Sequence, residues 1–179
     1  MGQDRQHRLT GRVAVVAPPG LADRIDALHA EPGFTAAALD VSNLEPGVRD
    51  VGDLRLEARR VRHTSNSFAF RVSRGDAPDA AGLVYSGDCG SAIDLAPLIR
   101  PGDDLLVEAS FGLGPVPRGA EHLDAPAIVD LAAQARPGRI VLTHIQMGHD
   151  PAATVAAVQA GIGGAVLLAE PGLRLTLAG

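Results

Sequence analysis

Short runs of apolar residues, each bounded by Gly, Pro or Asp, recur along the chain and predict strands and helices in succession. In the first half most runs are rich in β-branched residues or alternate apolar with polar positions, which is typical of strands. The segment 54–61 alternates and is followed by the alternating segment 68–72, so we expect these two to pair as a hairpin. The strands expected in this half are 12–17, 36–41, 54–61, 68–72 and 82–86.

The second half changes to a regular alternation of strands and helices. Strands are expected over 104–108, 140–143, 165–168 and 173–177, and helices over 93–99, 124–135 and 152–160. An earlier helix begins at Leu21 and ends at Gly33. This order predicts an α/β sandwich in which helices cover the outside of sheets. Since no repeat or linker interrupts the pattern, we expect residues 1–179 to form a single domain.

Composition narrows the classes of function. Hydrophobic residues make up 46% of the chain and aromatic residues 3%, which argues for a globular core and against a stacking platform for single-stranded nucleic acid. The net charge of −5 argues against a broad phosphate-binding face. The one basic cluster, Arg59, Arg60 and Arg62, is more typical of a solvated strand edge. A single cysteine, and the lack of an apolar leader or a membrane-length apolar run, predict a cytoplasmic protein without a membrane partner.

Polar side chains that could carry chemistry stand where apolar strands end. His63, Asp88 and His144 each follow such a strand, and Glu108 ends another. Ligands collect at strand ends in α/β sheets, and an Asp with two His is a donor set suited to zinc, or to manganese or iron. Taken singly, His63 and Asp88 are also typical of turns, whereas a polar ring directly after the apolar strand of His144 is harder to explain structurally.

Three further positions have weaker signals. His122 stands just before the predicted helix 124–135, where it is either a loop contact or a general acid. Cys89 is a possible ligand or nucleophile, but a small half-buried side chain in a tight turn fits it better. His149 has no supporting pattern and is expected on the surface.

The stretch 61–177 resembles the carboxyl-terminal half of metallo-β-lactamase-fold hydrolases, in the branch of ribonuclease Z and cyclic-nucleotide phosphodiesterase-like proteins. The resemblance rests on VRHTSNSFAFRV, LVYSGDCG, EASF…EHLDA and IVLTHI, in that order. It implies an αββα sandwich and a hydrolytic site with two zinc ions. His63 would bind the first metal, Asp88 would bridge both and take part in catalysis, and His144 would bind the second. His122 would protonate the leaving group or steady the phosphate, while a metal-bridging hydroxide attacks a phosphodiester or another ester.

One departure from the family pattern is large. The 179 residues contain no His-x-His-x-Asp-His, the family's first metal motif, which would stand upstream of Arg12. Each metal would then keep two protein ligands, so weak or absent zinc binding and an inactive short chain are expected. Three explanations stay open. The chain is amino-terminally truncated, it is a degenerate module for binding or assembly, or another chain of a homo-oligomer supplies the missing ligands.

The expected function is therefore metal-dependent hydrolysis of a small-molecule ester or phosphodiester. The sequence has no long basic arm of the kind with which a ribonuclease Z grips transfer RNA, so nucleic acid is not the expected substrate. An unrelated small α/β binding domain, with structural Asp and His residues, is the remaining class.

Overall fold

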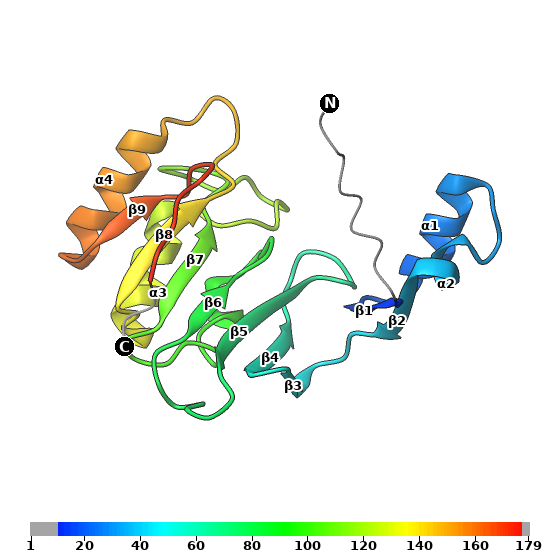
Figure 1. Ribbon diagram of the computed structural model, residues 1–179. Helices are drawn as coiled ribbons and strands as arrows, with labels where there is room; N and C mark the ends of the chain where they lie inside the picture. Colours follow the sequence, from blue (N-terminus) through cyan, green and yellow to red (C-terminus); the bar gives the residue numbers. More distant parts are fainter. Residues whose placement is uncertain (1–10, 177–179) are drawn as a thin grey trace, which may run out of the picture. The chain divides into compact units, whose positions relative to one another are not determined.

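The computed structural model describes residues 11–176, and the chain divides into two compact units between Glu45 and Pro46 (Figure 1). The first unit holds two parallel strands, β1 (Val13–Ala17) and β2 (Leu39–Asn43), with two helices between them, α1 (Leu21–His29) and α2 (Phe34–Ala38). The second unit holds every other element. That residues 1–179 form a single domain stays a prediction.

Within the first unit, the strand expected at 12–17 and the helix beginning at Leu21 are confirmed. The strand expected at 36–41 is partly wrong, because its first residues belong to α2 and the strand begins only at Leu39. Successive alanines favour a helical turn, whereas parallel pairing with β1 holds the residues that follow them in the extended conformation. Asp26 holds this turn in place by accepting hydrogen bonds from the backbone N–H groups of Gly33 and Thr35 and from the Thr35 hydroxyl.

The second unit is built on one seven-stranded sheet with the order β3-β4-β5-β6-β7-β8-β9. Its strands are β3 (Gly47–Val51), β4 (Leu54–Arg60), β5 (Phe68–Arg74), β6 (Leu83–Tyr85), β7 (Asp104–Glu108), β8 (Arg139–Thr143) and β9 (Val166–Leu168). The expected hairpin is confirmed, since β4 and β5 pair antiparallel over their whole length. β5 is antiparallel to β6, and β6, β7, β8 and β9 are mutually parallel. β4, β6, β7 and β8 therefore run in the same direction, and their carboxyl ends lie at one edge of the sheet.

Two helices and a short 3₁₀ turn pack on one face of this sheet: α3 (Ala125–Ala135), α4 (Pro151–Ile162) and η1 (Ala92–Asp94). Both helices begin with an Asp whose side chain accepts hydrogen bonds from backbone N–H groups, followed by a proline in the first turn. The core between sheet and helices is apolar. Its fully buried members include Val84, Leu95, Leu98, Leu105, Val107, Ile128, Leu142 and Val158. No helix among residues 11–176 is long and apolar enough to span a bilayer.

Three expectations for the second unit differ from the structure. The helix expected at 93–99 is reduced to η1, because Pro97 disfavours helical backbone in the residue before it. β3 was not expected, since the charges of its Gly47–Val51 segment hide its alternation. Residues 173–176 form no strand; instead Leu173 and Leu175 line a hollow against the second face of the sheet, and Leu177 lies outside the described residues.

Candidate metal centre

The candidate site lies at the sheet edge where β4, β6, β7 and β8 end. His63 follows β4, Asp88 follows β6 and His144 follows β8, so the common strand direction brings all three to one edge. The sequence predicted that these side chains converge, and the structure brings them together around Asp88. Its carboxylate oxygen Oδ1 lies 3.1 Å from His144 Nδ1, and Oδ2 lies 3.8 Å from His63 Nε2.

Two glycines fix the loop that carries Asp88. Gly87 has a positive φ of 56°, and a Cβ at this position would stand 2.6 Å from the carbonyl oxygen of Phe68. A Cβ on Gly90 would stand 2.8 Å from the Cβ of Glu121, so the loop after β6 approaches the loop of His122 very closely. The turn therefore needs glycine on both sides of Asp88 to place the carboxylate where it lies.

His122 enters the same cluster. Asp88, His122 and His144 each offer a ligand atom, and these atoms all lie within 4.8 Å of one another. The ring centroid of His122 is 4.7 Å from that of His63 and 5.8 Å from that of His144. The sequence placed His122 near the reacting group, and the structure places it among the residues that could hold a cation.

A buried carboxylate beneath the cluster organises its loops. Glu108, at the end of β7, is 1% exposed and accepts four hydrogen bonds. Oε1 accepts from the backbone N–H of Cys89 at 3.1 Å and lies 2.9 Å from His122 Nδ1. Oε2 accepts from the backbone N–H of Ser110 at 3.0 Å and from its hydroxyl at 2.6 Å. The sequence places Glu108 at a strand end but indicates no role for it, and no pattern indicates Ser110, although it stands only two positions further along.

Each of the three imidazoles has an acceptor beside its Nδ1 atom. His63 Nδ1 lies 2.9 Å from the carbonyl oxygen of Glu121, and His122 Nδ1 contacts Glu108. His144 Nδ1 lies 3.2 Å from the hydroxyl oxygen of Ser110 in addition to its contact with Asp88. His144 also has a positive φ of 54°, a conformation that costs energy for a residue other than glycine and that clusters at functional sites.

The remaining candidates lie beside the centre. Cys89 is fully buried, and its thiol donates to the carbonyl oxygen of Ser91. Burial raises the pKa of this thiol to about 11. His149, expected on the surface, is half-buried, and its ring lies 5.9 Å from that of Phe111, which in turn lies 6.1 Å from His122. The expectation for His149 is thus wrong, because the loop after β8 folds its ring against Phe111.

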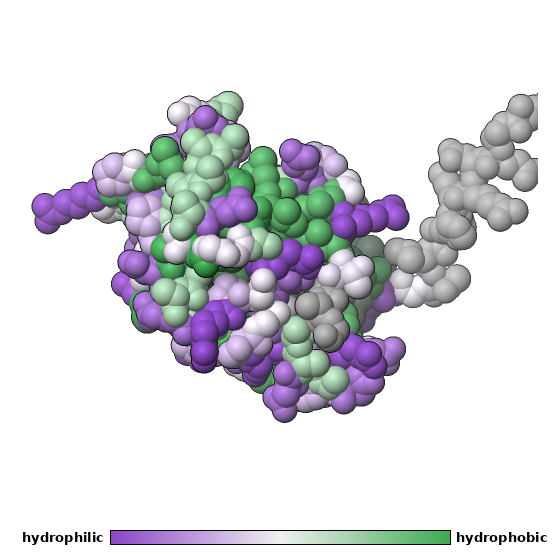
Figure 2. All heavy atoms as spheres, turned by 90° about the vertical axis from the view of Figure 1, so that its left-hand side faces the viewer, coloured by the Kyte–Doolittle hydropathy of each residue, from purple (hydrophilic) through white to green (hydrophobic). Residues whose placement is uncertain are grey.

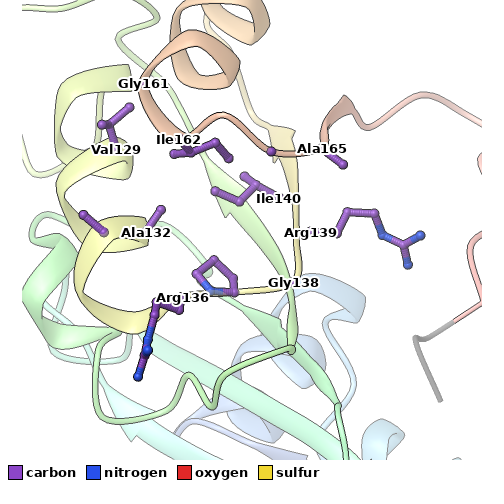
Figure 3. A pocket seen from close by; sticks show the side chains of 12 residues that line it. Val129, Ala132, Arg136, Gly138, Arg139, Ile140, Gly161, Ile162 and Ala165 are labelled. Carbon is purple, nitrogen blue, oxygen red and sulfur yellow. The ribbon is translucent and has the colours of Figure 1, made fainter.

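A hollow at the ends of the helices is a separate feature. A cavity of about 360 Å³ lies between the ends of α3 and α4 and the start of β8, and it contains none of the predicted site residues (Figure 3). Val129, Ile140 and Ile162 form its apolar wall, while the side chains of Arg136 and Arg139 point away from each other at its rim. Viewed from the side of α4 and β9, hydrophobic and hydrophilic residues are interleaved over the surface (Figure 2).

Comparison of the structure with solved structures establishes the fold. The metallo-β-lactamase fold protein YhfI from Bacillus subtilis superposes with a TM-score of 0.76, covering 90% of this chain and 63% of that one, at 16% identity. This chain has the metallo-β-lactamase fold. A diphosphatase of the PhnP family (TM-score 0.66, 18% identity, 94% and 60% coverage) and human tRNase Z, short form (0.61, 18%, 95% and 70%), are similar to it as well.

Sequence comparison gives partial matches. An uncharacterised protein of Mycobacterium leprae is 38% identical over 95 residues, which are 53% of this chain and 32% of that protein. An uncharacterised protein of Mycobacterium tuberculosis is 37% identical over 95 residues, 53% of this chain and 34% of that protein. The match thus spans about a third of each mycobacterial relative. No family model matches the chain.

Proposed function

We propose that the sheet edge around Asp88 is the active site of a metal-dependent hydrolase that cleaves a phosphodiester or another small ester. The observation that carries this proposal is the position of the Asp88 carboxylate, which turns one oxygen toward His144 and the other toward His63. A carboxylate with an imidazole beside each oxygen is suited to bridging two cations. The metallo-β-lactamase fold of the chain supports the same assignment.

The donor set fits divalent metal ions of intermediate hardness. Imidazole nitrogens and carboxylate oxygens bind zinc, manganese and iron, and the Asp88 side chain is 41% exposed, so ions and substrate can reach it. His63 and Asp88 would hold one ion, and Asp88 and His144 the other. Bound there, the ions would act as Lewis acids and lower the pKa of water. The acceptor beside each Nδ1 atom fits a metal centre too, since ligating histidines usually donate their second nitrogen to such a group.

His122 is the residue we assign to proton transfer. Its Nδ1 atom donates to the buried Glu108 carboxylate, which fixes the orientation of the ring. A ring held in this way can pass a proton to the departing oxygen through its second nitrogen.

A small substrate bearing a phosphate or carboxylate ester fits the site better than a nucleic acid. The chain carries a net charge of −5, which disfavours a long polyanion. The similarity to a diphosphatase of the PhnP family supports phosphate-ester chemistry.

The test uses hydrolysis of bis-p-nitrophenyl phosphate with added Zn²⁺ or Mn²⁺. The 179-residue chain should hydrolyse it no faster than buffer with the same metal, because its residues give each ion only two ligands. A chain extended upstream of Met1 to include a His-x-His-x-Asp-His motif should be active. In that extended chain Asp88→Ala and His144→Ala should abolish turnover.

The matched control is Asp130→Ala, which removes an exposed carboxylate on α3 and should leave the rate unchanged. Robust metal-dependent turnover by the short chain, lost in Asp88→Ala, would contradict the expectation that two ligands per ion are too few for activity. An inactive extended chain would contradict the hydrolase assignment and favour a binding or assembly module.

A further inference from the structure

The Ser110 hydroxyl lies at the centre of the buried network and touches two of the site histidines. Ser110 is fully buried, and its Oγ atom lies 3.2 Å from His122 Nδ1 and 3.2 Å from His144 Nδ1. It also lies 2.6 Å from Glu108 Oε2. A serine hydroxyl has one proton to donate and two lone pairs with which to accept.

The proton of this hydroxyl is committed to Glu108. A distance of 2.6 Å is typical of a charge-assisted bond from a hydroxyl to a carboxylate, and no imidazole nitrogen competes at that distance. Toward both histidines, Ser110 Oγ is therefore an acceptor. An attractive contact then requires a proton on Nδ1 of each ring, and in a neutral ring this leaves Nε2 without a proton.

The two histidines depend on Ser110 to different degrees. His122 Nδ1 has a second acceptor, Glu108 Oε1, at 2.9 Å. The other acceptor of His144 Nδ1 is Asp88 Oδ1, and this oxygen is the one that would turn to a cation under the proposed function. Once Asp88 binds a cation, Ser110 is the acceptor left for the Nδ1 proton of His144.

We propose that Ser110 is a positioning residue that holds His144 in the Nδ1–H tautomer and so keeps its Nε2 lone pair free for a metal ion. The role of the free Nε2 lone pair in metal binding rests on the proposed function, whereas the Nδ1–H tautomer itself is expected in the metal-free protein. Glu108 would act through Ser110 in the same way, because it orients the hydroxyl whose lone pair faces His144.

The experiment measures the imidazole tautomers of the metal-free 179-residue chain at pH 8 by long-range ¹H–¹⁵N correlation. The wild-type chain should show His122 and His144 predominantly as Nδ1–H. In Asp88→Ala, which removes the other acceptor of His144 Nδ1, His144 should stay Nδ1–H. Adding Ser110→Ala should shift His144 to the Nε2–H form that free imidazole favours in water, while His122 stays Nδ1–H on Glu108. Adding Ser110→Thr instead keeps the hydroxyl and should leave His144 as Nδ1–H.

Ser86→Ala is the matched control. Ser86 is also a fully buried serine beside Glu108, since its Oγ accepts from the Glu108 backbone N–H, but among residues 11–176 no hydrogen bond joins it to a histidine. This variant should leave both tautomers as in the wild type. A predominantly Nε2–H His144 in the wild-type chain overturns the proposal, even if Ser110→Ala does not fold. A folded Asp88→Ala/Ser110→Ala variant with His144 unchanged as Nδ1–H overturns it too.

A zinc titration of the wild-type chain and of the Ser110→Ala and Ser86→Ala variants separates this proposal from the hydrolase assignment. Ser110→Ala should weaken the zinc affinity about 10-fold or more, the usual effect of losing the partner of a ligating histidine, and Ser86→Ala should not. Zinc binding with His144 as Nε2–H overturns the role of Ser110 and leaves the metal centre standing. The expected tautomers without any zinc response at His144 support the role of Ser110, and the metal centre is then tested by the activity of the extended chain.

Discussion

A buried carboxylate needs hydrogen-bond donors for its oxygen lone pairs. Glu108 accepts four hydrogen bonds, and the donors lie on three separate loops. The backbone N–H of Cys89 belongs to the loop after β6, Ser110 to the loop after β7, and His122 to the segment before α3. A carboxylate oxygen accepts about two hydrogen bonds, so all positions of Glu108 are used. The loops that carry Asp88 and His122 are thereby fastened to the same group.

Cys89 should be nearly inert in the folded protein, although it stands next to Asp88. Its side chain is fully buried, and burial raises the pKa of the thiol from an ordinary 9.0 to about 11. At pH 8 the thiolate fraction is then roughly 100-fold smaller than for an exposed thiol. Modification by a disulfide reagent should therefore be at least about 100-fold slower in the native chain than in urea. Equal rates in the two states would show that the thiol is accessible and ionised.

At the scale of elements, a buried ion pair joins the hairpin to the central strands. Arg71 of β5 is 2% exposed and donates to both carboxylate oxygens of Asp103 and to the carbonyl oxygens of Pro78 and Ala80. Asp103 also accepts from the backbone N–H groups of Gly82 and Arg100. The pair thus ties the β5–β6 connection to the start of β7.

Replacing Asp103 should show how much this ion pair contributes to the free energy of unfolding. Burial raises the pKa of Asp103, but hydrogen bonds from Arg71 and from backbone N–H groups outweigh it, so the pKa lies below its ordinary value. Stabilisation by the carboxylate is therefore fully present above about pH 4 to 5 and is lost as the pH falls through the unfolded pKa toward the folded one. Asp103→Asn should cost about 3–5 kcal/mol at pH 7, because Arg71 is left buried without a counter-charge.

Urea unfolding of both proteins at pH 7 and at pH 3 measures this cost. The difference between wild type and Asp103→Asn should shrink at pH 3, because this pH lies below the ordinary carboxyl pKa of 3.8 and Asp103 takes up a proton on unfolding there. Asp76→Asn is the control, since the Arg74–Asp76 pair is exposed and screened by water, so its loss should change the stability far less. A difference that stays constant between the two pH values would contradict the assignment to the ion pair.

Most strands and helices could be predicted because their apolar periodicity is local. The hairpin of β4 and β5 and the alternation from β6 to α4 follow directly from it. The helix predicted for 93–99 was wrong. The apolar spacing of this segment is helical, but Pro97 restricts the backbone before it, and this restriction outweighs the pattern. β3 was missed because its pairing with β4, a contact between segments, decides its conformation.

The candidate site was predictable only in part. Strand-end positions indicated His63, Asp88 and His144, since parallel strands deliver their ends to one edge. β4 runs in the same direction as β6 because β5 lies between them and is antiparallel to both. The hairpin pattern predicted the antiparallel pairing of β4 with β5. The contact of Ser110 with two imidazoles depends on side chains of three loops, and no spacing in one sequence reports which buried polar groups face one another.

At the scale of the whole molecule, the centre draws its residues from most of the length of the second unit. His63 comes from the hairpin, Asp88 from the first parallel strand and His144 from β8, so the site forms only when the sheet has assembled. The helices lie on one face of this sheet and the candidate residues at its edge. Stability and ligand binding are therefore separable, because core substitutions act on the face and site substitutions act on the edge.

Zinc affinity tests this view for the 179-residue chain. His63 and Asp88 would hold one ion, and Asp88 and His144 the other. The ligands that we assign among residues 11–176 would thus number two per ion, where a tight site has three or four. Binding should fall well short of the ~10–16 kcal/mol of a complete structural site. Calorimetric titration should show weak binding that Asp88→Ala removes and that Asp79→Ala, at an exposed loop position, leaves unchanged. Tight binding of two ions per chain would mean that further residues of this chain are ligands, and retention of zinc by Asp88→Ala would remove Asp88 from its bridging position.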